Sequence, residues 1–350
     1  MKNDEKKEHI DLHGVFRAVL SHLPERSQDI IAKRFGVTEK KPLTLQAIGD
    51  EYNITRERVR QIVQSGLKSM RDVEEHDDLE MVQNAITDFV QKHHGIVAEN
   101  AIIDFLGGEE YSSRGSVRFF IEGLTDVEFV NVKKYPVEER VVMHADFDVE
   151  KWFAVHNLVK ELLEAQQKVH TIDHIHKHVA STHENIDHDQ LIKYLIVSRE
   201  IGKNPFDKWG IVEWDDVSPR GVREKALLIM KEQNKPMHFR EIAEAIDHYG
   251  LGKKGKKSHP QTVHNELIRD KNFVLVGRGV YALNTESYIK GTVKDVIENV
   301  LNNSDEPLTA EEVVERVLTM RYVKPSTIKV NLNAVAKKLN KKYTLDTKRK

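Results

Sequence analysis

The side chains best suited to chemistry lie at the start of the segment spanning residues 55–71. Arg56 and Arg60 stand one helical turn apart, beside Glu57 and Gln61. Arginine pairs bidentately with guanine, glutamine pairs with adenine, and glutamate accepts a hydrogen bond from cytosine. A recognition helix presents its N-terminal end to the base edges. The pattern therefore predicts a helix that reads duplex DNA in the major groove.

The surrounding residues have the spacing needed to hold such a helix in place. Thr55 is a good N-cap for it, and Asn53 suits a left-handed turn just before it. A short helix is expected over residues 43–52, and two more between residues 12 and 35, with Pro24 in the first turn of the second. The apolar positions at helical intervals are Val59, Ile62, Val63, Leu67 and Met70. The segment is thus expected to form a helix-turn-helix.

Four motifs in this segment resemble region 4 of the sigma-70 family of bacterial RNA polymerase sigma factors. In order they are Leu23-Pro24-Glu25-Arg26, Arg34-Phe35-Gly36, Leu43-Thr44-Leu45-Gln46-Ala47-Ile48-Gly49 and Thr55-Arg56-Glu57-Arg58-Val59-Arg60-Gln61-Ile62. The resemblance covers about residues 12–72. It implies that the last helix enters the major groove of a promoter −35 element. It also implies that the flanking helices dock on the flap of the polymerase β subunit.

The DNA-contacting residues predicted in this module are Thr55, Arg56, Glu57, Arg58, Arg60, Gln61 and Lys68. Region 2 of the family, which opens the −10 element, has no room before residue 12 and no visible counterpart later. We therefore expect the chain not to act alone as a complete initiating sigma factor.

Residues 220–283 contain a second recognisable pattern. Apolar spacing predicts a helix after residue 221, a second over the segment that Pro236 opens, and a third with Pro260 in its first turn. Two β-prone runs then flank Gly277-Arg278-Gly279, which indicates a hairpin, or wing. The stretches 263–267 and 276–283 resemble the HARE-type helix-turn-helix family. That family occurs in the δ subunit of bacterial RNA polymerase, in restriction systems and in chromatin proteins, so the resemblance implies association with DNA or polymerase.

A lysine-rich loop precedes the third of these helices. Two interpretations stay open for it: mobile lysines that contact phosphates, or an exposed solubilising loop. A nucleotide-binding P-loop is rejected, because Lys257 stands where serine or threonine is required and no strand precedes the loop. The DNA-contacting residues predicted in this module are Lys253, Lys254, Lys256, Lys257, Gln261 and Arg278.

A similar turn recurs along the chain and suggests a tandem array. It reads Pro42-Leu43-Thr44, Pro236-Met237-His238 and Pro307-Leu308-Thr309, each before a short apolar-periodic segment. We predict a mainly α protein built from small helix-turn-helix and winged-helix domains with short β wings. Modules one to five are expected at residues 12–72, 79–145, 149–216, 220–283 and 289–345. Wing strands are expected at 127–132 and 210–214, and the helices of module five near 293–302, 309–321 and 326–339.

Charge is distributed unevenly among these modules. Residues 73–219 hold 14 Lys or Arg against 29 Asp or Glu, a net charge of −15, although the whole chain carries only −2. Residues 220–283 hold 13 against 7, or +6, and residues 284–350 hold 13 against 9, or +4. Basic surfaces attract phosphate and acidic ones repel it. Modules two and three are therefore expected to serve as spacers or to bind protein.

Other classes of function find little support in the sequence. His170, His174 and His178 are expected to share a helix face, but no His-Glu-x-x-His pattern accompanies them, so no metal or other cofactor is assigned. No nucleophile elbow or phosphate loop is present, so we predict neither an enzyme nor a small-molecule substrate. The absence of cysteine and of a long apolar segment favours a cytoplasmic protein without membrane contact.

The predicted function is sequence-specific DNA binding in transcription, sigma-like or associated with RNA polymerase. Its partners would be double-stranded promoter DNA and the polymerase core. The alternative is a polymerase-associated scaffold that binds proteins and has little direct contact with DNA.

Overall fold

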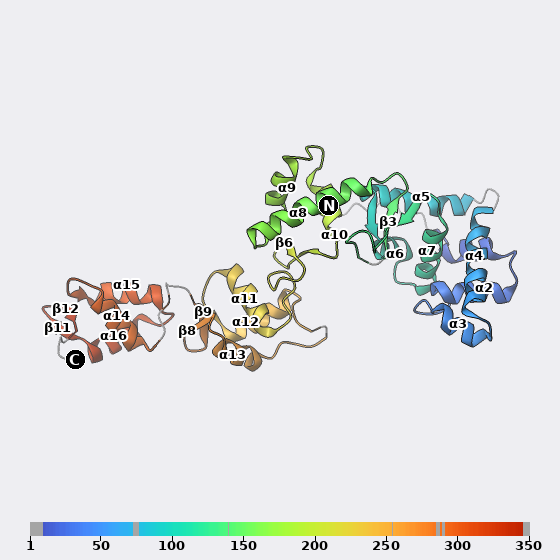
Figure 1. The fold of residues 1–350 in the computed structure, drawn as a ribbon. Coiled ribbons are helices and arrows are strands. Elements are labelled where there is room, and N and C mark those ends of the chain that lie inside the picture. The colour runs from blue at the N-terminus through green and yellow to red at the C-terminus, as the bar shows by residue number, and fades with distance from the viewer. Residues whose placement is uncertain are drawn as a thin grey trace. The chain divides into compact units, whose positions relative to one another are not determined.

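A computed structural model describes residues 10–72, 77–138, 140–253, 255–284, 288 and 291–345. Within them the chain forms 16 helices and 12 short strands (Figure 1), and the strands belong to small three-stranded sheets. The predicted fold class, mainly α with helix-turn-helix units and short wings, is confirmed. The chain divides into two compact units, residues 1–202 and residues 203–350.

Module one consists of four helices without a strand among its described residues. They are α1 (Leu12–Leu20), α2 (Glu25–Phe35), α3 (Leu45–Tyr52) and α4 (Arg56–Asp72). The Thr44 hydroxyl caps α3 by accepting the amide hydrogen of Ala47, and Asn53 ends that helix in the left-handed region at φ 51°. Pro24 was expected in the first turn of α2 but is its N-cap. Its fixed φ suits this position too, because its missing N–H would have no helical partner.

Modules two and three repeat one order of elements: a helix, a strand, two helices and two strands. Module two contains α5 (Asp77–Lys92), β1 (Ile96–Ala98), α6 (Glu99–Gly107), α7 (Tyr111–Gly123), β2 (Val127–Phe129) and β3 (Val141–His144). Module three contains α8 (Val149–Gln166), β4 (His170–Thr171), α9 (Ile172–Ala180), α10 (His188–Ile196), β5 (Ile201–Lys203) and β6 (Lys208–Ile211). The predicted wing strand at 210–214 thus lies a few residues earlier.

Modules four and five have the same order of elements. Module four contains α11 (Val222–Gln233), β7 (Met237–His238), α12 (Phe239–His248), α13 (Pro260–Arg269), β8 (Phe273–Gly277) and β9 (Val280–Leu283). Module five contains α14 (Val293–Asn302), β10 (Leu308–Thr309), α15 (Ala310–Met320), α16 (Pro325–Val335), β11 (Lys337–Leu339) and β12 (Lys342–Thr344).

Two expectations about individual elements were wrong. The helix predicted over 326–339 ends at Val335, and Lys337–Leu339 pairs with β12 as a strand. The apolar spacing continued past the helix end because alternate residues of a wing also face the core. His170 lies in β4 rather than in a helix, so it does not share a helix face with His174 and His178.

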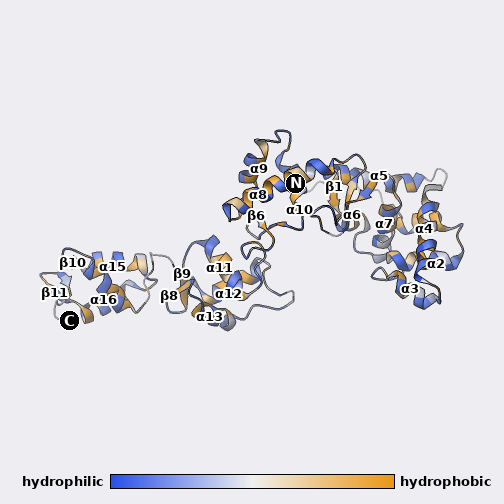
Figure 2. Ribbon diagram, in the orientation of Figure 1, coloured by the Kyte–Doolittle hydropathy of each residue, from blue (hydrophilic) through white to orange (hydrophobic). Residues whose placement is uncertain are grey.

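Each of the four sheets places its first strand beside its third and its third beside its second, as in β1-β3-β2 and β7-β9-β8. The pairings are antiparallel, with Val97 opposite Val142 and Met237 opposite Tyr281. This order lets the last two strands form a hairpin that projects as a wing while the first strand anchors the sheet. The helices show one apolar and one polar side (Figure 2), as expected for elements that pack on a core along one stripe.

Modules one and two share one hydrophobic core. Helix α7 packs against α1, α2 and α4, and a single buried cluster runs from Leu12 through Met70 and Phe119 to Val142. The rings of Phe16 and Phe35 meet that of Phe119 edge to face, with centroids 5.1 and 5.4 Å away. The sequence did not predict this fusion of two modules.

Candidate nucleic-acid interface

The N-terminal end of α4 is built as the sequence predicts. The hydroxyl of Thr55 accepts the backbone N–H of Arg58 at 3.1 Å, which satisfies one of the free amides at the helix start. Val59 is fully buried and Val63 nearly so, which fixes the rotation of the helix. The opposite face, formed by Arg56, Glu57, Arg58, Arg60 and Gln61, is exposed within the described part of the chain.

The charged side chains at this end are held in pairs. Arg60 grips Glu57 with two hydrogen bonds, Nε to Oε2 at 2.8 Å and Nη2 to Oε1 at 2.5 Å. This contact lowers the pKa of the Glu57 carboxyl and raises the pKa of Arg60. Arg58 donates from Nη1 to Oε1 of Gln61 at 3.2 Å. Arg60 must release Glu57 to reach a guanine, or carry it into the groove as a donor–acceptor pair.

The turn between α3 and α4 leaves no room for variation. A side chain at Gly49 would meet the carbonyl oxygen of Ile54 at 2.8 Å. Polar side chains then tie α3 to α2: Lys33 bonds to Glu51, and the Tyr52 hydroxyl donates to Asp29. The contact with Glu51 raises the pKa of Lys33. Such a fixed turn sets the angle at which α4 projects from the module.

Lys68 is exposed but stands apart from the other predicted contacts of module one. It lies twelve residues after Arg56, about 18 Å along the helix axis at 1.5 Å per residue. It therefore cannot join the base-reading end, and only a backbone phosphate role remains for it.

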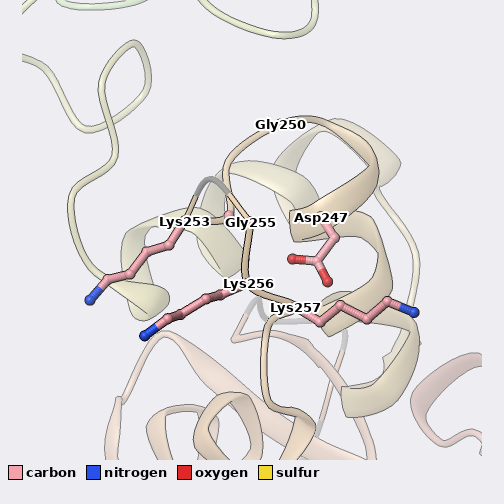
Figure 3. Close-up of a pocket in the computed structure, with 7 residues that line it drawn as sticks. Asp247, Gly250, Lys253, Gly255, Lys256 and Lys257 are labelled. Carbon is pink, nitrogen blue, oxygen red and sulfur yellow. The ribbon is translucent and has the colours of Figure 1, made fainter.

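The predicted contacts of module four lie in the second unit, on three exposed elements. Lys253, Lys256 and Lys257 belong to the loop before α13. Asp247 organises this loop by accepting the backbone N–H of Ser258 at 3.0 Å and its hydroxyl at 2.7 Å. Lys253 and Lys256 extend to one side of the loop and Lys257 to the other, around a cavity above Asp247 (Figure 3). Lys254 lies outside the described residues.

The other two contacts predicted in module four are also exposed. Gln261 sits in the first turn of α13, where its amide donates to Asn265 at 3.1 Å. Arg278 occupies the tip of the wing between β8 and β9. Gly279 beside it has φ 71°, a conformation that disfavours any residue with a Cβ.

Helix α7 occupies in module two the place that α4 has in module one, and its surroundings are different. Arg114 is engaged by Asp104 at 2.7 Å. Arg118 is half-buried and donates to the carbonyl oxygen of Phe35 at 3.5 Å, and burial lowers its pKa. The helix is enclosed by module one, so its arginines do not form a reading face. Buried small residues at Gly115 and Ser116 were the sequence signal for this packing.

No other site emerges from the described residues. No three His, Asp or Glu side chains among them gather as metal ligands would. His170 and His174 stack with ring centroids 4.2 Å apart instead. None of the described helices is both long and apolar enough to cross a bilayer.

The fold and the exposed α4 end define a helix-turn-helix protein, and two families match parts of the chain. Residues 19–72 match the family model "Sigma-70, region 4". Residues 221–285 match the HARE-HTH family model, a helix-turn-helix domain described from ASXL and restriction endonuclease proteins. Both resemblances suggested by the sequence are confirmed. The two matches indicate a DNA-binding protein of the sigma-like transcription class.

Relatives are found for the first of these regions. The chain is 45% identical over 62 residues to "RNA polymerase sigma factor RpoD" of Helicobacter pylori strain 26695, and equally to that of strain J99. The similarity covers 17% of this chain and 9% of each relative. It therefore concerns the helix-turn-helix region alone.

Proposed function

We propose that the chain binds duplex DNA sequence-specifically through α4, reading a promoter −35-like element, and acts with RNA polymerase as a sigma-like regulator. One observation carries this proposal. The capped end of α4 presents Arg56, Glu57, Arg60 and Gln61 together on an exposed surface. These residue types hydrogen-bond to base edges in the major groove.

Basic elements of module four supply a second, sequence-independent contribution. Lys253, Lys256 and Lys257 project from the loop before α13, and the segment 220–283 carries a net charge of +6. Lysines that neutralise phosphates release counterions, so they strengthen binding to any sequence. Gln261 and Arg278 are the further contacts proposed for this module.

A second candidate function is a scaffold that binds polymerase and has little contact with DNA. It is favoured by the acidity of residues 73–219 and by the enclosure of α7, which removes one helix from DNA binding. In either function the polymerase core is the proposed partner, through the flap of its β subunit. Part of α1 and α2 is covered by α7, so such docking would use their remaining surface.

The test of DNA reading is a comparison of two duplexes, one with a −35-like element and one scrambled, by fluorescence anisotropy at several salt concentrations. Arg60→Ala should reduce the preference for the −35-like duplex roughly ten- to hundredfold. Arg17→Ala, which removes an exposed arginine of α1, is the matched control and should leave that preference intact.

Two results would redirect the assignment. An equal loss on both duplexes would make α4 a grip on phosphates rather than a reader of bases. Absence of binding at low salt would favour the scaffold. Co-purification of the chain with isolated β subunit then tests the polymerase contact separately.

A further inference from the structure

Module five is joined to the wing of module four by a backbone hydrogen bond. The N–H of Tyr322 donates to the carbonyl oxygen of Val276 at 2.9 Å. Val276 belongs to β8, the edge strand of the β7-β9-β8 sheet, and Tyr322 lies in the turn between α15 and α16. The turn that precedes the last helix of module five is thus docked on the open edge of the wing of module four.

A buried arginine reinforces this junction. Arg321 is only 7% exposed, and its guanidinium donates to the carbonyl oxygens of Leu275 and Gly291. Its Nε has no partner among the described residues, and burial lowers its pKa. A buried charge satisfied only by carbonyls is unfavourable. The arrangement is therefore informative only if the docking itself has a use.

The two backbones approach too closely for a side chain to stand between them. A Cβ placed on Gly277 would clash with the carbonyl oxygen of Tyr322. Gly277 has no positive φ, so its own backbone would tolerate alanine. The close approach to Tyr322 is what requires glycine here.

This docking brings two exposed cations near each other. Arg278 follows Gly277 at the wing tip, and Lys324, the N-cap residue of α16, lies two residues after Tyr322. Chain geometry keeps their Cα atoms within roughly 17 Å. Both side chains are exposed, and the side chain of Tyr322 between them is 64% exposed although its backbone is fixed.

We propose that the wing of module four and the N-terminal end of α16 form one composite surface for the backbone of duplex DNA. Arg278 and Lys324 contact phosphates, Tyr322 packs against the sugar-phosphate chain between them, and Arg321 is a positioning residue. The positive end of a helix favours an anion, and both modules carry net positive charge. The inference rests on the proposed DNA binding but not on sequence reading by α4.

The partner is duplex DNA rather than an acidic protein because the two cations sit on separate projecting elements, a wing and a helix end. Two tethered contacts held at a fixed spacing bind more tightly than two free ones, since the second contact is then intramolecular. Fixing the junction therefore has a use that explains the unfavourable burial of Arg321.

The junction is tested first by a distance measurement on the full chain. The protein has no cysteine, so spin labels can be placed at Glu244→Cys on α12 and Glu315→Cys on α15, both exposed positions. We expect one narrow distance distribution. Gly277→Ala should broaden it without removing a buried group, and Arg321→Met provides a second route. A broad distribution in the parent, or no broadening by either variant, overturns the junction.

DNA binding is measured on the scrambled duplex in an Arg60→Ala background, so that failure of α4 reading does not affect the outcome. Gly277→Ala should weaken this binding roughly tenfold. Lys324→Gln should lower the slope of log K against log salt by about 0.9, the contribution of one phosphate contact. Lys294→Gln, at an exposed lysine of α14, is the charge-matched control. Unchanged binding by Gly277→Ala with a broadened distance, or an unchanged slope for Lys324→Gln, overturns the composite surface.

Discussion

Helices α4 and α7 hold the same position in their modules and have opposite surroundings. Each follows a shorter helix and a turn, and each carries arginines near its start. The polar face of α4 is exposed from Arg56 to Gln61. Helix α7 is enclosed by α1, α2 and α4. Position within a helix-turn-helix therefore does not decide whether a helix can read DNA.

The residue types on the outer face account for the difference. Helix α7 has glycine where module one comes closest. A Cβ on Gly115 would meet the backbone of Gly36 at 2.6 Å, and one on Gly123 would clash with the side chain of Met70. Phe119 then fills the space between Phe16 and Phe35. Helix α4 instead has charged side chains that lose hydration if buried, so its outer face stays in solvent.

The largest effect is expected from the enclosed helix. Phe119→Ala removes a fully buried ring and should destabilise the first unit by about 3–5 kcal/mol. Because modules one and two share a core, amide hydrogen exchange should accelerate in α1 and α2 as well as in α7. Phe105→Ala, at a ring that is 45% exposed, is the control. Unchanged exchange in α1 and α2 would show that the two modules are independent.

A smaller effect is expected at the start of α4. Thr55→Ala removes the hydroxyl that accepts the N–H of Arg58 and should destabilise the helix start by about 1 kcal/mol. Faster hydrogen exchange of the first amides of α4 measures this loss. The first turn of α7 should be unaffected, because no side chain caps it through a hydrogen bond. Equal acceleration in both helices would mean that the cap supports the whole unit instead.

The ion pair on α4 separates affinity from specificity. Glu57→Gln releases Arg60 and removes a negative charge from the DNA-facing surface. Binding to the scrambled duplex should strengthen a few-fold, while discrimination at a cytosine position falls because the carboxylate acceptor is lost. Titration of both duplexes by anisotropy measures the two quantities. Weaker binding to the scrambled duplex would show that Glu57 positions Arg60 productively.

Local signals in the sequence were sufficient for the helix-turn-helix of module one. Thr55 caps α4, and Asn53 takes the left-handed turn with φ 51°, because both preferences act within a few residues. The resemblance to region 4 was equally recoverable, since its motifs are contiguous.

Long-range packing was not recoverable in the same way. The burial of α7 depends on Gly36, Phe16 and Met70, which lie far from it in sequence and carry no local signal of their partner. The junction at Arg321 was missed for the same reason. Its partners are the backbone carbonyls of Leu275 and Gly291, and a carbonyl has no residue type to recognise. Side-chain chemistry was therefore predictable where it acts locally and not where it meets a distant backbone.

The smallest effect is expected from an arginine of the enclosed helix. Arg114 bonds to Asp104 at 2.7 Å and donates to the carbonyl oxygen of Gly108 at 2.9 Å, so its charge is already satisfied within module two. Arg114→Gln should leave DNA affinity and its salt slope unchanged, although Arg114 and Arg56 are the same residue type near the start of corresponding helices. Salt-dependent anisotropy on both duplexes provides the comparison, with Arg56→Gln as the matched variant expected to lower the slope by about 0.9. A similar decrease for Arg114→Gln would mean that α7 also faces DNA, and the contrast between the two helices would then fail.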